Sequence, residues 1–212
     1  MKEISVIIST LNRPSLEQTI KSIKAQNVDV QLLVRYDPDV NEYKSRDMAI
    51  KDATTPYIAF IDDDAYYEPN AIRNALKYLM KGYAFVEGLL QGDFFGTGFT
   101  RLTQSHLGVG TAQFITKEAY EKVGGFRLDW GTEPRTGWRM DTALLYDVFR
   151  EYGEEKYVHA EDVVVTHPKM MQSAINPDVE HKFYNEYRSY VEKYILPIDP
   201  RLQQYVKIWG GK

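Results

Sequence analysis

Short apolar segments alternate with amphipathic ones along residues 1–100, and this alternation restricts the fold more than any other feature of the sequence. Residues 4–10 (ISVIIST) and 57–61 (YIAFI) are almost continuously apolar or β-branched, as in strands that are covered on both faces. Apolar residues recur at helical spacing in residues 15–26 (SLEQTIKSIKAQ). Such alternation is typical of βα units. The sequence therefore predicts an α/β fold with a mostly parallel central sheet flanked by helices.

The same patterns predict the remaining elements. Further strands are expected at residues 30–36 and 83–90, within 112–126 and within 156–168. Further helices are expected at residues 41–53, 71–82 (with Pro69 in the first turn), 139–153 and 179–195. Residues 91–110 are glycine-rich and aromatic, which indicates loops and short strands. Residues 127–136 lack any period and indicate a long functional loop.

Composition and charge exclude several classes of protein. The chain has 212 residues and no Pro/Gly/Ser-rich linker, so we expect one domain with a C-terminal extension. The formal net charge of −4 argues against a nucleic-acid partner, and the absence of cysteine excludes thiol catalysis and cysteine-bound zinc. No apolar stretch approaches the roughly 20 residues that span a bilayer, and the N-terminus lacks a signal-peptide pattern. We therefore expect a cytoplasmic protein.

Three consecutive aspartates, Asp62, Asp63 and Asp64, directly follow the strand expected at residues 57–61. Ligands of parallel α/β sheets bind at the carboxyl ends of strands. Adjacent carboxylates repel one another unless a cation or hydrogen-bond donors offset the repulsion. Oxygen ligands suit Mg²⁺ or Mn²⁺, which usually complete their coordination shell with substrate phosphates. The triplet therefore predicts a divalent cation that bridges the protein and a phosphate.

Three other interpretations of the triplet compete with this one. In a solvated turn, one aspartate would cap the helix expected at residues 71–82, and this interpretation stays open for the aspartate that does not face a ligand. A calcium loop would need the alternating ligands, central glycine and terminal glutamate of an EF-hand, which are absent. An aspartyl-phosphate phosphatase would have Thr or Val in place of Tyr66 and further Lys and acidic motifs, which are not obvious in the sequence.

Six segments together carry a resemblance to a known family. They are SVIISTLNRPSLEQTIKSI, an aspartate after the second strand, SRDMAIKDATTPYIAFIDDDAYYEP, VGGF, GWRMDTALLYDVFREYG and VVVTHP. In order and approximate spacing, they resemble the inverting family 2 glycosyltransferases of the GT-A fold. The resemblance covers roughly residues 4–168. It implies a GT-A catalytic domain over residues 1–170, with a nucleotide-binding half (1–90) and an acceptor-binding half (91–170), and a C-terminal helical extension over residues 171–212.

The resemblance also implies a donor site. In this family the D-x-D element binds a nucleoside diphosphate sugar, here a UDP-sugar by preference, through Mn²⁺ or Mg²⁺. By this resemblance Asp64 is the metal ligand, Asp62 or Asp63 reaches the ribose, and His167 completes the metal site. An imidazole ligand would favour Mn²⁺ modestly. The other residues implied to contact the nucleotide sugar are Thr10, Asn12, Arg13, Asp37 and Arg46, with Asp39 as the competing choice for Asp37.

On the acceptor side, the family has a Glu-Asp pair whose aspartate is the general base. This chain has Met140 and Asp141 there, so the glutamate is missing and the base position is kept. Inverting single displacement needs one carboxylate within hydrogen-bond reach of the acceptor hydroxyl. An apolar neighbour, such as Met140 or Trp138, would raise the pKa of Asp141. Asp141 is equally an ordinary first-turn residue favoured by the helix dipole, and the two roles are compatible.

Further residues are expected to contact the sugar or the acceptor. These are Gly125, Trp138 and Arg139. Arg135 and Arg139 are also expected to hold the diphosphate when the loop of residues 127–139 closes.

The resulting functional hypothesis is a hexosyltransferase that moves a sugar, with inversion, to a hydroxyl of a saccharide, lipid-linked or protein acceptor. One alternative is a metal-dependent nucleotidyltransferase, although STLNRPS lacks the glycines of its phosphate loop. Another is a non-catalytic module that binds a nucleotide sugar or a metal, which the missing glutamate favours. The aromatic residues of 179–195 and 201–212 are expected to cover the sheet, with homodimerisation or contact with a membrane surface as alternatives.

Overall fold

The computed structural model describes residues 2–39, 41–94, 99–102, 105–131, 139–170 and 176–209. The strands are β1 (Ile4–Thr10), β2 (Val30–Tyr36), β3 (Tyr57–Phe60), β4 (Tyr66–Tyr67), β5 (Phe85–Phe94), β6 (Phe99–Leu102), β7 (Gln113–Thr116) and β8 (Tyr157–Met170). The α-helices are α1 (Leu16–Lys24), α2 (Glu42–Ile50), α3 (Ala71–Met80), α4 (Lys117–Lys122), α5 (Met140–Tyr152), α6 (Pro177–Glu186), α7 (Arg188–Tyr190) and α8 (Pro200–Trp209). Short 3₁₀ helices span Gly110–Ala112, Leu128–Trp130 and Glu154–Lys156, and Val191–Ile195 form a π-helical turn.

The strands form one sheet with the order β2-β1-β3-β7-β5-β8-β4, and β6 pairs with β5. β1 runs parallel to β2 and β3, and β5 runs parallel to β8. β7 lies antiparallel between β3 and β5, so β5 and β8 still run in the direction of β3. The predicted α/β fold is confirmed, and the sheet is mixed because β4, β6 and β7 are antiparallel to their neighbours. The carboxyl ends of β1, β2, β3, β5 and β8 nevertheless lie at one edge.

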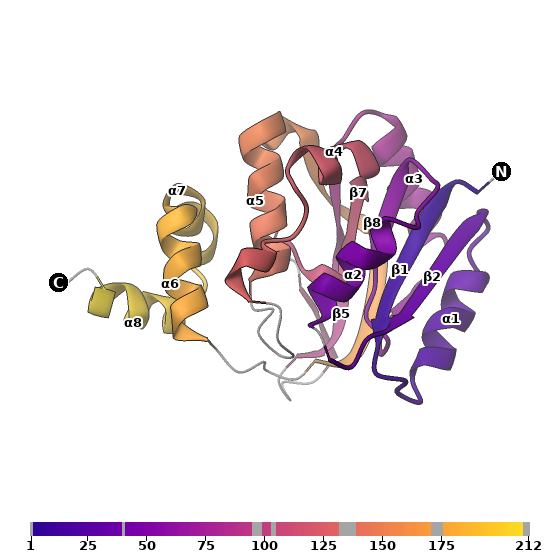
Figure 1. Ribbon diagram of the computed structural model, residues 1–212, viewed down its shortest axis with the longest axis horizontal. Coiled ribbons are helices and arrows are strands. Elements are labelled where there is room, and N and C mark those ends of the chain that lie inside the picture. The colour runs from indigo at the N-terminus through magenta and orange to yellow at the C-terminus, as the bar shows by residue number, and fades with distance from the viewer. Residues whose placement is uncertain are drawn as a thin grey trace.

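Helices cover both faces of the sheet, so the strands are buried on two sides as their apolar sequences predict (Figure 1). Successive residues of a strand point to opposite faces. Val6 and Ile8 of β1 accordingly belong to the core beneath α1 and α3, whereas Ile7 belongs to the core beneath α2, α4 and α5. The predicted βα arrangement is therefore confirmed for the first half of the chain.

The C-terminal extension, which the structure describes over residues 176–209, differs from its prediction. The single helix expected at residues 179–195 is divided into α6, α7 and the π-helical turn, because Tyr187 leaves helical geometry at φ −120° and ψ 29°. The expected tail contains α8. Figure 1 shows α6, α7 and α8 on the far side of α5 from the sheet. The extension therefore packs on α5 and does not cover the sheet directly.

Several smaller predictions also need correction. Pro69 lies outside α3, because Asn70, at φ 66°, is the residue that precedes the first helical one. β5 continues to Phe94, beyond its expected end at residue 90, and β6 follows as one of the short strands expected within residues 91–110. In the described part of the chain, no helix has the length and apolar character needed to cross a membrane.

Candidate active site

The aspartate triplet and His167 meet because β4 pairs with β8. This pairing sets Tyr66 opposite Thr166, so the residues just before β4 lie beside the residue that follows Thr166. The Nε2 atom of His167 is 3.1 Å from Oδ1 of Asp64 and 3.8 Å from Oδ2 of Asp62. One ligand atom from each of the three side chains lies within 4.8 Å of the others. This group of two carboxylates and one imidazole is the metal cluster.

The side chain of Asp63 is turned away from the metal cluster. It is 4% exposed and accepts hydrogen bonds from Thr10 Oγ1 at 2.6 Å and from the Leu11 backbone N–H at 3.3 Å. Its Oδ1 also lies 3.2 Å from Nη1 of Arg13. Asp63 therefore fastens the end of β1 to the end of β3, and it is the member of the triplet with a structural task.

Positive charge already surrounds the carboxylates of the metal cluster. Arg13 donates to Oδ2 of Asp64 at 2.7 Å. Burial acts to raise the pKa of Asp64, but His167 and Arg13 outweigh burial and lower it. Burial acts to lower the pKa of His167, but the carboxylates of Asp64 and Asp62 raise it. Two carboxylates and an imidazole within mutual reach are a donor set that fits Mn²⁺ or Mg²⁺, with the nitrogen favouring Mn²⁺.

Arg46 is a buried cation at the edge of the metal cluster. Its side chain is 1% exposed, and Nη2 donates to Oδ1 of Asp62. The guanidinium carbon lies 5.4 Å and 5.8 Å from the ring centroids of Tyr43 and Phe60. Nε and Nη1 are buried and have no hydrogen-bond partner among the described residues. Buried donors are normally paired, so these two nitrogens point to an anionic or polar ligand.

Asp141 stands at the start of α5, on the Nη1 side of the Arg46 guanidinium. Its Oδ1 accepts from the Thr142 N–H at 2.8 Å and its Oδ2 from the Gly110 N–H at 3.1 Å. Burial raises the pKa of Asp141, against the opposing effects of these two hydrogen bonds and of the positive charges of Arg139 and Arg46. The raised pKa agrees in direction with the expectation for a base beside the buried Met140.

Gly110 brings Arg46 and Asp141 together. A Cβ atom on Gly110 would lie 2.9 Å from Nη1 of Arg46 and 3.4 Å from Oδ2 of Asp141. Any larger residue would therefore push the two charged groups apart. Sequence reasoning did not identify Gly110, nor Thr111, whose Oγ1 accepts from the backbone N–H of Asp62 at 3.1 Å. The glycine-rich segment was visible in the sequence, but nothing in it singled out these two positions.

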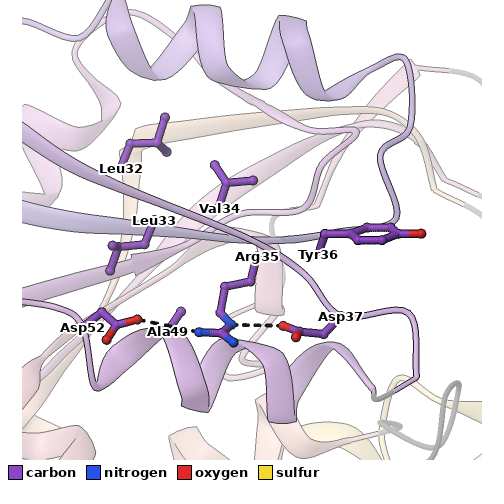
Figure 2. Close-up of a pocket in the computed structure, with 8 residues that line it drawn as sticks. All are labelled: Leu32, Leu33, Val34, Arg35, Tyr36, Asp37, Ala49 and Asp52. Carbon is purple, nitrogen blue, oxygen red and sulfur yellow. Dashed lines mark hydrogen bonds and ion pairs between the residues drawn. The ribbon is translucent and has the colours of Figure 1, made fainter.

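Asp37 lies at the same edge of the sheet, next to a pocket of about 390 Å³ beside β2 (Figure 2). Tyr36 pairs in register with Thr10, so Asp37 follows β2 where Leu11 follows β1. Oδ2 of Asp37 accepts from Arg35 at 3.0 Å and from Ser45 at 2.8 Å, and these bonds lower its pKa. Among the predicted site residues, Asp37 is the one that lines this pocket. The pocket is therefore distinct from the metal cluster.

The structure gives local explanations for three other predicted residues. Asn12 adopts φ 59°, and its backbone N–H donates to Thr10 Oγ1 at 2.8 Å. Gly125 adopts φ 75°, and a Cβ atom there would lie 2.8 Å from the hydroxyl of Tyr120, so packing alone requires glycine. Arg139 forms ion pairs with Glu180 and Asp199, each at 3.0 Å, and points to the extension. Trp138 and Arg135 lie outside the described residues.

The comparison with protein families agrees with this geometry. The model of the family described as "Glycosyl transferase family 2" matches residues 33–135. This part of the chain is similar to glycosyl transferase family 2. The glycosyltransferase match includes Asp37, Arg46 and the aspartate triplet. It ends before Asp141 and His167. The evidence that these two residues lie at the site is their position in the structure.

Solved structures show that the fold is GT-A. The chain is similar to residues 1–349 of S. aureus TarS in complex with UDP-GlcNAc, with a TM-score of 0.65 and 10% identity, over 96% of this chain and 70% of the other. It is similar to a longer S. aureus TarS structure with a TM-score of 0.61 and 11% identity, over 98% of this chain and 42% of that one. The chain thus spans less than half of the longer structure. No curated protein sequence matches it.

Proposed function

We propose that the protein transfers a hexose from a nucleoside diphosphate sugar to an acceptor hydroxyl, with metal dependence and inversion at the sugar carbon. One observation carries the proposal. The buried guanidinium of Arg46 contacts Asp62 of the metal cluster with Nη2 and directs Nη1 towards Gly110 and Asp141. A cation site and a carboxylate of raised pKa therefore lie on the two sides of one positive charge. Donor phosphates and an acceptor hydroxyl need such an arrangement.

For the donor, we assign Asp64 and His167 to the metal, and Asp62 to the ribose side of the same cluster. When bound, the divalent cation would offset the negative charge that develops on the departing diphosphate. The unpaired Nε and Nη1 atoms of Arg46 are suited to hold a phosphate oxygen. A UDP-sugar is the favoured donor, because the similar TarS structure contains UDP-GlcNAc.

For the base of the nucleotide, we assign Asp37. A carboxylate accepts hydrogen bonds and does not donate, so it suits the imide N–H of uracil. The pKa of Asp37 is lowered by Arg35 and Ser45, which keeps it ionised for this task. Both of these contacts are to Oδ2, so the proposed contact with the base is assigned to Oδ1.

For the acceptor, we assign Asp141 as the general base. Its carboxylate would take the proton of the hydroxyl as the hydroxyl oxygen forms a bond to the anomeric carbon. The bond from that carbon to the diphosphate breaks on the opposite face, which inverts the configuration. A raised pKa makes the carboxylate a better proton acceptor than an exposed aspartate. The hydrogen bonds from Gly110 and Thr142 fix its orientation.

The test uses a panel of nucleotide sugars with the full chain, with and without Mn²⁺. Thermal stabilisation measures binding, and release of the nucleoside diphosphate in the presence of acceptor hydroxyls measures transfer. We expect Asp64→Asn to lose the Mn²⁺-dependent stabilisation. We expect Asp141→Asn to keep that stabilisation and to lose about 10²- to 10⁴-fold in turnover, the usual contribution of a general base.

Asp147→Asn is the matched control for Asp141. It makes the same chemical change on the same helix, at a partly buried aspartate that accepts from the Tyr187 hydroxyl at 2.8 Å. We expect near-normal turnover from it. The unmodified chain could instead bind a nucleotide sugar and show no transfer. If Asp141→Asn then left that binding unchanged, the protein would be a non-catalytic binding module. Normal turnover in both Asp64→Asn and Asp141→Asn would refute the mechanism.

A further inference from the structure

Arg139 connects the start of α5 to the C-terminal extension. It lies two residues before Asp141, and its side chain is only 14% exposed. Nε donates to Oε1 of Glu180 in α6 at 3.0 Å, and Nη2 donates to Oδ2 of Asp199 at 3.0 Å. The guanidinium carbon lies 5.6 Å from the ring centroid of Phe183. Two carboxylates and an aromatic ring, all from the extension, thus surround one arginine beside the base.

Both carboxylates are themselves fixed in place. Glu180 is 2% exposed and sits on a helix that Asn176 caps through the backbone N–H groups of Asp178 and Val179. Asp199 uses its second oxygen, Oδ1, to accept from the backbone N–H of Leu202 in the first turn of α8 at 3.1 Å. The ion pairs therefore join Arg139 to the starts of two helices, and the position of Arg139 depends on the whole extension.

The backbone of Arg139 is also unusual. Its φ of 67° is left-handed, a conformation that costs energy in a residue other than glycine. No side-chain cap closes the start of α5 at this position, and the Arg139 carbonyl instead accepts the first helical hydrogen bond, from Ala143 at 2.9 Å. A strained arginine persists only where its surroundings hold it, and the groups that hold Arg139 include Glu180, Asp199 and Phe183.

We propose that Arg139 is a positioning residue through which the C-terminal extension holds the first turn of α5, and hence the carboxylate of Asp141, in its working orientation. The inference rests on the proposed role of Asp141 as the base. It replaces the expectation that Arg139 contacts the sugar or the diphosphate. It also gives the extension a task in transfer beyond covering apolar surface.

Arg139→Gly is the decisive variant, because glycine adopts the left-handed conformation freely and so keeps the backbone while removing the guanidinium. We expect kcat to fall about 10- to 100-fold, the range for a displaced catalytic group, with an unchanged KM for the nucleotide sugar. Arg139→Lys keeps one charge and should recover part of kcat. Glu180→Gln and Asp199→Asn should each lower kcat, and their combination should approach Arg139→Gly.

Arg150→Gly is the matched control. Arg150 also ties α5 to α6, through Glu186 at 3.0 Å, but it lies at the far end of α5 from Asp141. If these ion pairs only attach the extension, Arg150→Gly and Arg139→Gly should behave alike. Equal kcat values in the two variants, at equal thermal stability, would overturn the inference.

A second readout does not require turnover. In the full chain with ¹³C-labelled aspartate, the side-chain carboxyl resonance of Asp141 is assigned by its loss in Asp141→Asn. We expect Arg139→Gly to shift this resonance and to move its titration to higher pH, whereas Arg150→Gly leaves both unchanged. Arg46, Glu42 and Tyr43, which also interact with Asp141 from α2, are intact in both variants.

These readouts separate the inference from the proposed function. If no nucleotide sugar yields transfer but the Asp141 resonance responds to Arg139→Gly alone, positioning is supported and the proposed function fails. If the unmodified chain transfers sugar but neither kcat nor the resonance responds to Arg139→Gly, the inference fails and the proposed function stands.

Discussion

The three neighbouring aspartates point in different directions, and each direction has its own contacts. Asp62 and Asp64 face His167, whereas Asp63 accepts hydrogen bonds from Thr10 and Leu11. The three residues lie in a turn, in which the Ala65 N–H donates to the Asp62 carbonyl at 3.3 Å, so identical neighbouring side chains point in different directions and acquire different tasks. This difference can be measured by making the same substitution at adjacent positions.

Asp63→Asn should affect stability more than metal binding. The amide of asparagine cannot replace every contact of a carboxylate that is 4% exposed, accepts hydrogen bonds from Thr10 and Leu11, and forms an ion pair with Arg13. We expect the free energy of unfolding to fall by about 1–3 kcal/mol, as for other buried hydrogen-bond partners. Urea denaturation measures this loss. Mn²⁺ affinity, measured by electron paramagnetic resonance with UDP present, should be retained.

Asp64→Asn should give the reverse pattern. Asp64 is 31% exposed, so its replacement should change the free energy of unfolding little, while Mn²⁺ affinity falls sharply. Similar Mn²⁺ affinities for the two variants would contradict the division of tasks within the triplet.

The pH dependence of transfer should report Asp141. A general base must be ionised, and burial raises the pKa of this carboxyl above the ordinary value of about 4. Activity should therefore be lost as the pH falls through this raised pKa, at a higher pH than for an exposed aspartate. The measurement is kcat against pH at saturating Mn²⁺ and donor, with binding checked at each pH. An acidic limb near pH 4, as for an ordinary aspartate, would argue against Asp141 as the base.

Among the secondary-structure elements, the pairing of β5 with β8 determines where His167 lies relative to the two aspartates of the metal cluster. Gly92 of β5 pairs with His167, and the register shifts directly after it. A Cβ atom on Gly92 would lie 1.8 Å from the backbone oxygen of His167, closer than any side chain permits. The two strands can therefore approach at this point only because residue 92 is glycine.

Gly92→Ala should displace His167 without changing a ligand. We expect a weaker Mn²⁺ affinity, approaching that of His167→Ala, because the backbone that carries the imidazole must move. Gly124→Ala is the matched control: it places alanine at φ 87° with no neighbouring atom within 4 Å. That variant should lose about 1 kcal/mol of stability through backbone strain and keep its Mn²⁺ affinity. Equal Mn²⁺ affinities for the two variants would show that the site tolerates movement of β8.

The sequence predicts elements well where apolar periodicity is strong. β1 and β2 begin and end where expected, since continuous β-branched runs leave few alternatives. The direction of β7 could not be predicted, because a strand of four residues carries no signal for its orientation. β4 has two residues and depends on its pairing with β8. The pairing that brings Asp64 to His167 was thus beyond local sequence patterns.

In the candidate site, too, residues with a local sequence signal could be predicted, whereas contacts between distant segments could not. The strand end indicated the aspartate triplet by its position, and the family resemblance added Asp141 and His167. The partners of Arg139 could not be found in this way, because Glu180 and Asp199 are distant in sequence and look like ordinary helix charges. Long-range ion pairs leave no periodic pattern for a sequence to display.

At the scale of the whole molecule, the extension and the sheet share one hydrophobic core. Phe183 and Tyr187 of the extension belong to the same cluster as Phe60 of β3 and Tyr146 of α5. The rings of Phe183 and Tyr146 stack with centroids 5.9 Å apart, and Trp130 packs edge-on against Phe183 at 6.2 Å. A continuous core of this kind favours cooperative unfolding of both parts together.

Phe183→Ala should therefore destabilise the whole protein. Phe183 is fully buried, and its truncation should cost about 3–5 kcal/mol. Far-ultraviolet circular dichroism and tryptophan fluorescence should keep one common unfolding midpoint at a lower urea concentration. Met80→Ala, at a residue that is 71% exposed, is the control and should shift the midpoint little. Two separate midpoints in Phe183→Ala would show that the extension unfolds by itself.

The residues of the metal cluster are far apart along the chain, and this separation matters while the protein is being made. Asp62 and Asp64 leave the ribosome long before β8, which carries His167, has been synthesised. A nascent chain that ends before β8 offers two carboxylates without the imidazole, and β4 has no partner strand to hold them. The proposed cation would therefore meet this complete ligand set only after β8 has docked on the sheet.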